Sequence, residues 1–406
     1  MRSKYDVIVV GARCAGSTTA MLLARRGYRV LAVDRATFPS DALSTHMINA
    51  PGVAALRRFG LLDAVIAAGT PAIDKFTFNF ALTDGPVSLS GRPLPSDGIR
   101  TGYAPRRTLL DKILVDAAAS AGVQIREGCT FDELIVEDDV VVGIRGHDRD
   151  GVTVEERARL VIGADGRSSR VAKLVEAEEY HTRPRLQYQY FTYWSGLPTD
   201  GFEIYSLPSR CWAAIPTNDD LTLVVVCWPN AERLAFRADI EGNYRATLEL
   251  WPEFARRVDH ATRVEPFSGA ACANYFRKPY GPGWALVGDA AYSRDPITAQ
   301  GISDAFEGAE LLTTAVHSHL NDNLPYEVAM ADYQRIRDQR RLPLYEHTTQ
   351  LARLEAPSPE LEQLLLAART DQAAMDGFVS VGAGTISPTE YFGPGNVTEL
   401  LERVGR

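Results

Sequence analysis

The sequence predicts an α/β protein in which a parallel-sheet domain is interleaved with an antiparallel-sheet domain and followed by C-terminal helices. Three observations lead to this prediction. Residues 6–34 follow the order strand, glycine turn, helix and strand, which is typical of the start of a parallel sheet. Short apolar strands that end beside a Gly and an Asp recur at residues 160–166 and 283–289. Residues 180–280 instead contain aromatic-rich strand patterns, two of them joined by a polar turn.

The bulk composition excludes some classes of protein and of partner. At 406 residues the chain is too long for one ordinary core, so we expect two domains. A net charge of -9 argues against nucleic acid as a partner. The five cysteines are scattered without C-x-x-C spacing, so we expect no disulfide framework, no metal site and a reducing, cytoplasmic location. No segment approaches the ~18 continuous apolar residues of a membrane helix, and we expect neither a membrane span nor a secretory signal.

The first strand is followed directly by a glycine turn that matches the dinucleotide-binding fingerprint. Residues 6–10 form a short β-branched run, and Gly11 and Gly16 bracket the turn before a helix that ends near Gly27. Gly11 would allow the tight turn, and Gly16 would let the helix pack closely on the strand. Asp34 ends the second strand, 18 residues after Gly16, where a carboxylate can accept hydrogen bonds from a ribose diol. The helix N-terminus would face a pyrophosphate.

The fingerprint departs from its usual form at its middle glycine, which is Arg13 in this chain. The guanidinium either lies along the pyrophosphate, for which it is a suitable partner, or points away from it. We favour an orientation toward solvent, because a bound pyrophosphate leaves little room for a residue with a β-carbon to fold inward.

Further motifs lie far along the chain. Residues 283–291 form an apolar strand that ends in Gly288-Asp289, followed by Asp295-Pro296, by Ala299-Gln300-Gly301 and by a helical pattern that begins at Ile302. A similar strand ends in Asp165-Gly166. A helix that begins near Arg107 lies between the first unit and these strands.

This set of motifs resembles the flavoprotein monooxygenases of the p-hydroxybenzoate hydroxylase type, together with their geranylgeranyl-reductase-like and halogenase relatives. The family order is glycine turn, Arg-led helix, Asp-Gly, and then Gly-Asp followed by Pro and a glycine-headed helix. All these motifs occur here in that order, across residues 6–320. The resemblance implies a Rossmann-type FAD-binding domain and an FAD-dependent oxidoreductase.

Carried over position by position, the resemblance implies a role for each motif. Asp34 holds the adenosine ribose, Arg107 reaches the ribityl-phosphate region, and Asp289 binds the ribityl or pyrophosphate segment. Gly301 and Ile302 present backbone N–H groups to the flavin N1–C2=O edge, where a helix N-terminus also stabilises the charge of a reduced flavin. The cofactor-binding candidates are Gly11, Ala12, Arg13, Ala15, Gly16, Asp34, Arg35, Arg107, Asp165, Gly288, Asp289, Gly301 and Ile302.

One of these motifs has a second interpretation, and others depart from the family pattern. Asp165 is followed by Gly166 and two serines, so helix capping is as good an interpretation as cofactor support. Many hydroxylases have histidine where this chain has Tyr292, and the family's Gly-x-Gly is Ala299-Gln300-Gly301 here. These departures indicate a divergent branch.

The domain organisation follows from the order of the motifs. The FAD-binding domain comprises residues 1–75, 105–179 and 281–320, the substrate domain comprises a hairpin at 76–104 and a β-sheet at 180–280, and residues 321–406 form a C-terminal helical region. In that region we expect helices at 332–354 and 359–378 and a Gly- and Pro-containing tail from 380. The aromatic strands suggest a wall over the flavin, with Tyr190, Tyr193 and Trp212 as candidate pocket residues.

The resemblance leaves more than one reaction open. The first is a monooxygenase that hydroxylates or epoxidises an aromatic or polyene small molecule through a flavin C4a-hydroperoxide. The alternative is a C=C reductase or dehydrogenase resembling geranylgeranyl reductase. A halogenase is less favoured, because Cys211 and Ala213 replace the tryptophans of that branch's W-x-W-x-I-P element, and we interpret Lys75 as a surface residue. A flavin-binding protein without turnover is a further alternative.

No catalytic side chain is assigned, because the cofactor carries most of this chemistry. No second glycine fingerprint is present for a nicotinamide. NADH or NADPH is therefore expected to reduce the flavin in transient encounters, unless a separate flavin reductase supplies reduced flavin.

Overall fold

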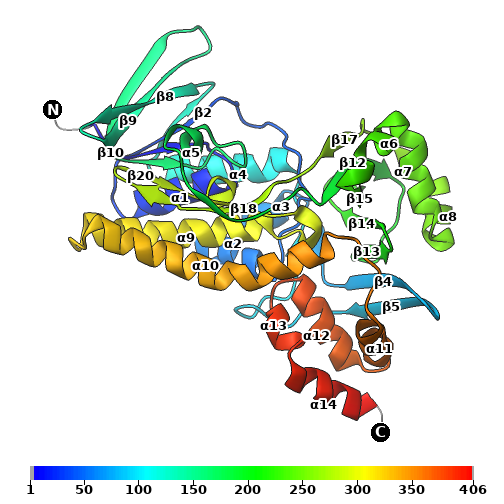
Figure 1. Cartoon of the computed structure of the whole chain (residues 1–406). Helices are drawn as coiled ribbons and strands as arrows, with labels where there is room; N and C mark the ends of the chain where they lie inside the picture. The colour runs from blue at the N-terminus through cyan, green and yellow to red at the C-terminus, as the bar shows by residue number, and fades with distance from the viewer. Residues whose placement is uncertain (1–3, 405–406) are drawn as a thin grey trace.

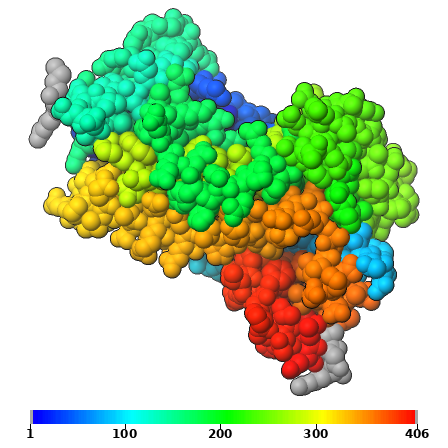
Figure 2. All heavy atoms as spheres, in the orientation of Figure 1, coloured from blue at the N-terminus to red at the C-terminus, as the bar shows by residue number. Residues whose placement is uncertain are grey.

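The structure, a computed structural model, describes residues 4–404. Figure 1 shows a parallel-sheet domain with the long helices α9 and α10 along one side, a second sheet domain beside it, and a cluster of C-terminal helices. The space-filling view in Figure 2 shows these parts as three lobes in contact. The predicted α/β fold with parallel and antiparallel sheets and C-terminal helices is confirmed.

The first domain is built on a mainly parallel sheet with the strand order β19-β20-β10-β1-β2-β7. Its strands are β1 (Tyr5–Val10), β2 (Val30–Asp34), β7 (Gln124–Glu127), β8 (Thr130–Glu137), β9 (Val140–His147), β10 (Thr153–Gly163), β19 (Tyr280–Gly281) and β20 (Trp284–Leu286). Strand β1 pairs in parallel with β2 and β10, and β20 pairs in parallel with β10. The hairpin β8–β9 extends from the N-terminal half of β10. Segments from three distant parts of the chain therefore share one sheet.

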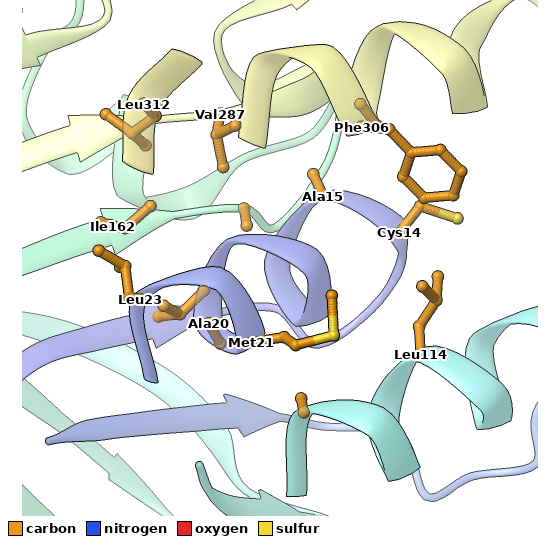
Figure 3. Close-up of a cluster of buried hydrophobic side chains, with 14 of the residues drawn as sticks. Cys14, Ala15, Ala20, Met21, Leu23, Leu114, Ile162, Val287, Phe306 and Leu312 are labelled. Atoms are coloured by element: carbon orange, nitrogen blue, oxygen red, sulfur yellow. The ribbon is translucent and has the colours of Figure 1, made fainter. Parts of the chain in front are cut away.

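Helices cover this sheet and bury its apolar strands. They are α1 (Cys14–Arg25), α2 (Ala50–Phe59), α3 (Leu62–Ala67), α4 (Arg107–Ser120), α5 (Arg170–Leu174), α9 (Gly301–Leu320) and α10 (Tyr326–Leu351). Figure 3 shows the core around α1, where Met21 and Leu23 lie between Ile162 of β10, Leu114 of α4 and side chains of α9. This packing fixes the N-termini of α1 and α9 against the ends of the strands.

The second domain is an eight-stranded, largely antiparallel sheet with the order β16-β12-β15-β14-β13-β4-β5, in which β17 also pairs with β12. Its strands are β4 (Phe76–Leu82), β5 (Gly85–Gly91), β12 (Gln187–Ser195), β13 (Phe202–Leu207), β14 (Arg210–Pro216), β15 (Leu221–Pro229), β16 (Thr262–Arg263) and β17 (Ser268–Ala270). The hairpin β4–β5 joins this sheet by a parallel pairing of β4 with β13, although it lies within the N-terminal quarter of the chain. The segment boundaries given above stay a prediction.

One face of the second sheet is closed by α6 (Arg233–Ala238), α7 (Ile240–Glu249) and α8 (Pro252–Asp259), which bury an aromatic cluster. The smaller elements are β3 (Ala72–Ile73) paired with β6 (Gly102–Tyr103), the sheet β11 (Glu179–Arg183), β18 (Asn274–Arg277) and β21 (Tyr292–Ser293), and the 3-10 turns η1 (Asn230–Glu232), η2 (Gly288–Ala290) and η3 (Pro296–Thr298).

The C-terminal region corrects two expectations. After α10 come α11 (Pro359–Ala368), α12 (Gln372–Gly382), α13 (Pro388–Tyr391) and α14 (Pro394–Val404). The expected Gly- and Pro-containing tail is largely helical over residues 380–404, because Pro388 and Pro394 begin helices instead of interrupting them. The single helix expected at 359–378 is two helices, α11 and α12. Within the described residues, no helix is long and apolar enough to cross a membrane.

Candidate cofactor-binding site

A cavity of about 720 Å³ opens at the carboxyl ends of the parallel strands. The turn after β1, Asp34 at the end of β2, Asp165 after β10, Asp289 after β20 and the start of α9 all line it. Open α/β sheets bind their ligands at this edge, because the loops that leave the strands meet there. The cavity thus brings the sequence motifs together.

The glycine turn has the geometry that its residues predict. Gly11 has φ +99°, and a β-carbon there would lie 2.5 Å from the carbonyl oxygen of Ala164. A β-carbon on Gly16 would lie 1.8 Å from the Gly11 carbonyl oxygen. Only glycine fits at these two positions, because helix α1 approaches the strand at backbone contact distance.

Asp34 is held at the cavity edge by the backbone. Its Oδ2 accepts the N–H of Ala12 at 2.8 Å, and its Oδ1 accepts the N–H of Ala36 at 2.8 Å. Each carboxylate oxygen can accept a further hydrogen bond, so the group stays available to a diol. Arg35, exposed beside it, also lines the cavity.

Arg107 enters the cavity from the start of α4 and is fixed by Asp111, one helical turn further along. Arg107 Nη2 lies 2.8 Å from Asp111 Oδ1, and the Asp111 side chain is fully buried. Arg13 Nη1 also bonds to Asp111 Oδ2 at 2.5 Å. A buried carboxylate between two guanidinium groups leaves one net positive charge, which favours a phosphate-bearing ligand.

Asp289 faces the cavity from η2. Gly288, with φ +62°, lies so close to α1 that an added β-carbon would be 2.6 Å from Ala15 Cβ. Burial raises the pKa of Asp289, while Arg167 and Arg107 oppose this effect. Tyr275 donates a hydrogen bond to the Asp289 carbonyl oxygen at 2.8 Å, which fixes the backbone of the turn.

The N-terminus of α9 forms the other end of the site. Gly301 lines the cavity and is exposed there, and a β-carbon added to it would meet no described atom within 4 Å. Gln300 precedes the helix and provides no side-chain cap. Among the described residues, no acceptor pairs with the N–H groups of Gly301 and Ile302. Together with the dipole of a 20-residue helix, they provide a site for an oxygen or a developing negative charge.

Comparison with known proteins identifies the family to which these features belong. A family model described as FAD binding domain matches residues 4–342. The chain belongs to the FAD-binding domain family. It is 28% identical over 334 residues to digeranylgeranylglycerophospholipid reductase of Methanosarcina acetivorans, which covers 79% of this chain and 77% of that protein. It is 27% identical over 336 residues to 6-methylpretetramide 4-monooxygenase of Streptomyces rimosus, which covers 75% of this chain and 73% of that protein.

Solved structures agree with the family assignment at the level of the fold. The myxobacterial chondrochloren halogenase superposes with a TM-score of 0.79 at 23% sequence identity, covering 98% of this chain and 96% of that chain. The chain is therefore an FAD-dependent oxidoreductase, and its relatives by sequence include proteins named as a reductase, a monooxygenase and a brominase.

The residues of this FAD-binding protein fit the cofactor. The cavity is bounded by the N-termini of two helices, α1 and α9, whose first amides lack protein acceptors among the described residues. Arg107 provides positive charge between them, and Asp34 provides an acceptor at one end. A dinucleotide requires this order of donors and acceptors. The contacts of the individual residues with FAD stay a prediction.

Asp165 is a motif residue whose carboxylate stabilises the start of a helix. Its Oδ1 accepts a hydrogen bond from Ser169 Oγ at 2.5 Å, and its Oδ2 accepts the N–H groups of Arg170 and Val171 at 2.6 and 3.2 Å. The carboxylate therefore caps α5, although the residue also lines the FAD cavity. The capping interpretation describes this side chain.

Two of the aromatic pocket candidates lie on the face of the second sheet that is turned away from the FAD cavity. Tyr190 and Trp212 are buried under α6–α8, where Trp212 stacks on Tyr205 at 4.8 Å between ring centroids. Neither lines the FAD cavity, so their placement does not support the prediction that they are substrate-pocket residues. Tyr193 lies on the cavity side of β12, but its hydroxyl bonds to His46 Nε2 and its ring packs against Arg106. From this strand, Gln189 and Phe191 line the cavity instead.

Sequence patterns do not single out Asp111, Asp295 or residues 42–45 as parts of the FAD site. Asp111 could have been identified from the sequence, because it lies four residues after Arg107 on a predicted helix, where opposite charges form an ion pair. Asp295 belongs to a motif that assigns it no role of its own. Residues 42–45 line the cavity from a loop with no local pattern to identify it.

Proposed function

We propose that this FAD-dependent oxidoreductase is a monooxygenase that hydroxylates or epoxidises an apolar aromatic or polyene molecule. NADH or NADPH reduces the flavin in a transient encounter, or a partner reductase supplies reduced flavin. One observation carries the proposal: the FAD cavity adjoins a small apolar pocket in the substrate sheet.

The apolar pocket lies between the cavity-side face of the second sheet and the loop before α9. Thr45, Gln189, Pro296 and Ala299 line both the pocket and the FAD cavity, so the two spaces adjoin. The other lining residues carry no charge; they are Phe202, Ile204, Cys211, Ala213, Ile215, Val225, Cys227 and Ile297. The pocket measures about 20 Å³, the space of one small group, so side chains must shift to admit a larger ligand. Such a wall favours an uncharged apolar moiety beside the flavin.

The side chains and backbone around the cofactor supply binding, orientation and exclusion of water. When bound, FAD supplies the electron transfer and the oxygen chemistry. The amides at Gly301 and Ile302 and the α9 dipole stabilise negative charge at the end of the cavity. The apolar wall would keep bulk water from the reacting groups and so limit unproductive release of peroxide.

Reduction of a C=C bond is the second candidate function. It is supported by the similarity to digeranylgeranylglycerophospholipid reductase and by the same apolar pocket, since an isoprenoid substrate is also uncharged where it reacts. Halogenation is supported least. Cys211 and Ala213, the positions of the halogenase tryptophans, are small residues of the apolar pocket, and Lys75 forms an exposed ion pair with Asp200 at 2.5 Å.

The proposal is tested by oxidation of NADH and NADPH by the FAD-loaded protein, with a panel of phenols, polyketides and polyprenyl compounds. We expect an uncharged apolar member to accelerate NAD(P)H oxidation and to limit peroxide release. Acceleration only by small charged acids would contradict the apolar-pocket argument. The proposed function would be contradicted if no compound of the panel accelerates NAD(P)H oxidation and none is converted when a reductase supplies reduced flavin.

A further inference from the structure

Residues 37–47, here called the strap, lie across the FAD cavity without regular secondary structure. Four consecutive strap residues, 42–45, line the cavity, and Leu43 among them is 41% exposed. Among the described residues, no backbone–backbone hydrogen bond joins the strap to any other segment. A loop of this length held without ladder hydrogen bonds depends on side chains for its position.

Side-chain contacts hold the strap at four places along its length. Glu127 Oε2 accepts the N–H of Phe38 at 3.0 Å near its start, and the Tyr193 hydroxyl bonds to His46 near its end. Between them, two arginines hold Ser40 and Asp41. Arg106 Nη2 lies 3.3 Å from Asp41 Oδ2 and also pairs with Glu265 at 2.8 Å.

The other arginine is Arg13, which replaces the middle glycine of the fingerprint. Its Nη2 donates to Ser40 Oγ at 2.9 Å and to the Asp41 carbonyl oxygen at 3.2 Å, and its Nη1 donates to the Ser40 carbonyl oxygen at 3.5 Å. The same guanidinium bonds to Asp111, which holds Arg107. Arg13 lines the cavity, but its guanidinium is bonded to protein groups and does not point freely into solvent. It joins the start of α1, helix α4 and the strap.

We propose that Arg13 is a positioning residue that latches the strap over the FAD cavity and thereby controls how fast FAD enters and leaves. The inference rests on the FAD-binding family, and it holds whichever reaction the enzyme performs. A glycine at this position would leave the strap with no bond to the fingerprint helix. The arginine adds three hydrogen bonds to the strap from a side chain that Asp111 already holds in place.

A latch and a phosphate ligand differ in their kinetics. Loss of a latch opens the strap and raises both the association and the dissociation rate constants of FAD, so the dissociation constant changes less than either rate. Loss of a direct phosphate contact raises the dissociation rate without raising the association rate. Ser40→Ala separates the two models, because Ser40 bonds to Arg13 but does not line the cavity.

The experiment measures FAD release from the holoenzyme after dilution and FAD rebinding to the stripped protein, both by flavin fluorescence. For Ser40→Ala we expect both rate constants to rise about three- to tenfold, as loss of one hydrogen bond predicts. For Arg13→Lys, which keeps the charge but not the fork of donors, we expect a larger rise in both. Ser90→Ala, which removes the Thr77–Ser90 hydrogen bond on the β4–β5 hairpin, is the matched control and leaves both rates unchanged.

A second readout needs no cofactor. Limited digestion of the FAD-free protein with a chymotrypsin-type protease is expected to cut at Leu43 faster in Ser40→Ala and Arg13→Lys than in wild type or Ser90→Ala. Wild-type rates and wild-type digestion in Ser40→Ala would overturn the latch. So would an Arg13→Lys variant that releases FAD faster but does not bind it faster, because that result would make Arg13 a phosphate ligand.

Discussion

At the scale of single residues, Asp295 is an unusual carboxyl group in this enzyme. It is 1% exposed, its Oδ1 accepts the Ile297 N–H at 3.1 Å, and its Oδ2 has no partner among the described residues. The neighbouring Arg294 pairs with Asp304 of α9 instead, at 2.7 Å. Burial raises the pKa of Asp295 to about 7, and only the Ile297 N–H opposes it. The group is therefore protonated below about pH 7 in the folded protein.

This raised pKa predicts a pH-dependent stability. The unfolded carboxyl has a pKa of about 4, so unfolding releases a proton between about pH 4 and pH 7, and the wild type loses stability as the pH rises through that window. Asp295→Asn keeps an acceptor for Ile297 without an ionisable group. Relative to wild type, we expect it to gain a few kcal/mol in free energy of unfolding between about pH 5 and pH 8. Denaturant titrations of the FAD-free proteins measure this difference, and an equal offset at both pH values would contradict it.

Asp289 carries the prediction that concerns cofactor affinity. Asp289 lines the cavity from η2, the turn after β20, where its carboxylate can form a charge-assisted hydrogen bond with FAD. Asp289→Ala is expected to weaken FAD binding by about 1.5–3 kcal/mol, roughly ten- to a hundredfold. Asp116→Ala is the control, because Asp116 pairs with Lys112 on the surface of α4 and does not line the cavity. Absorbance after gel filtration reports flavin occupancy, and full occupancy in Asp289→Ala would refute the assignment.

At the scale of elements, substitutions at two glycines of the site are expected to have different effects, one on folding and the other on cofactor binding. Gly16→Ala places a β-carbon against the Gly11 carbonyl, so we expect a loss of several kcal/mol of stability or no folded protein. Gly301→Ala meets no protein atom, so we expect a wild-type melting temperature and weaker FAD binding, because the new methyl group occupies cofactor space. Thermal melts with and without FAD test both. A wild-type melting temperature of Gly16→Ala would contradict the first prediction. Wild-type FAD affinity of Gly301→Ala, or a low melting temperature of that variant without FAD, would contradict the second.

The elements also show how far the sequence could lead. The strand, glycine turn and helix of the FAD domain follow from local patterns, so that part of the fold and the motif positions could be predicted. The strand period of two places Tyr190 and Phe191 on opposite faces of β12 but does not say which face meets the flavin. That choice depends on α6–α8, which pack over Tyr190 and Trp212 from a later part of the chain.

The contacts of Arg13 could not be predicted from the sequence, for a similar reason. Its partners Ser40 and Asp111 lie 27 and 98 residues away, and neither belongs to a fingerprint. Asp165, by contrast, uses partners within six residues, so the capping interpretation could be foreseen.

At the scale of the whole molecule, the FAD domain and the substrate sheet meet around one space. The loop before α9 separates the FAD cavity from the apolar pocket, and Ala299 in it has the left-handed φ of 50°. Gln300 Nε2 bonds to the Gly382 carbonyl oxygen at 2.9 Å, which ties the same loop to the C-terminal helices. All three lobes thus contribute to the position of the α9 N-terminus, where oxygen chemistry is proposed to occur beside an apolar ligand.

The most direct test of that claim is turnover under ¹⁸O₂, compared with turnover under strictly anaerobic conditions, using the first apolar compound that accelerates NAD(P)H oxidation. A monooxygenase incorporates one atom of the label into the product and reduces the other to water, so we predict labelled product and no product without oxygen. A saturated, unlabelled product formed at the full rate without oxygen would contradict the monooxygenase proposal and establish the reductase instead.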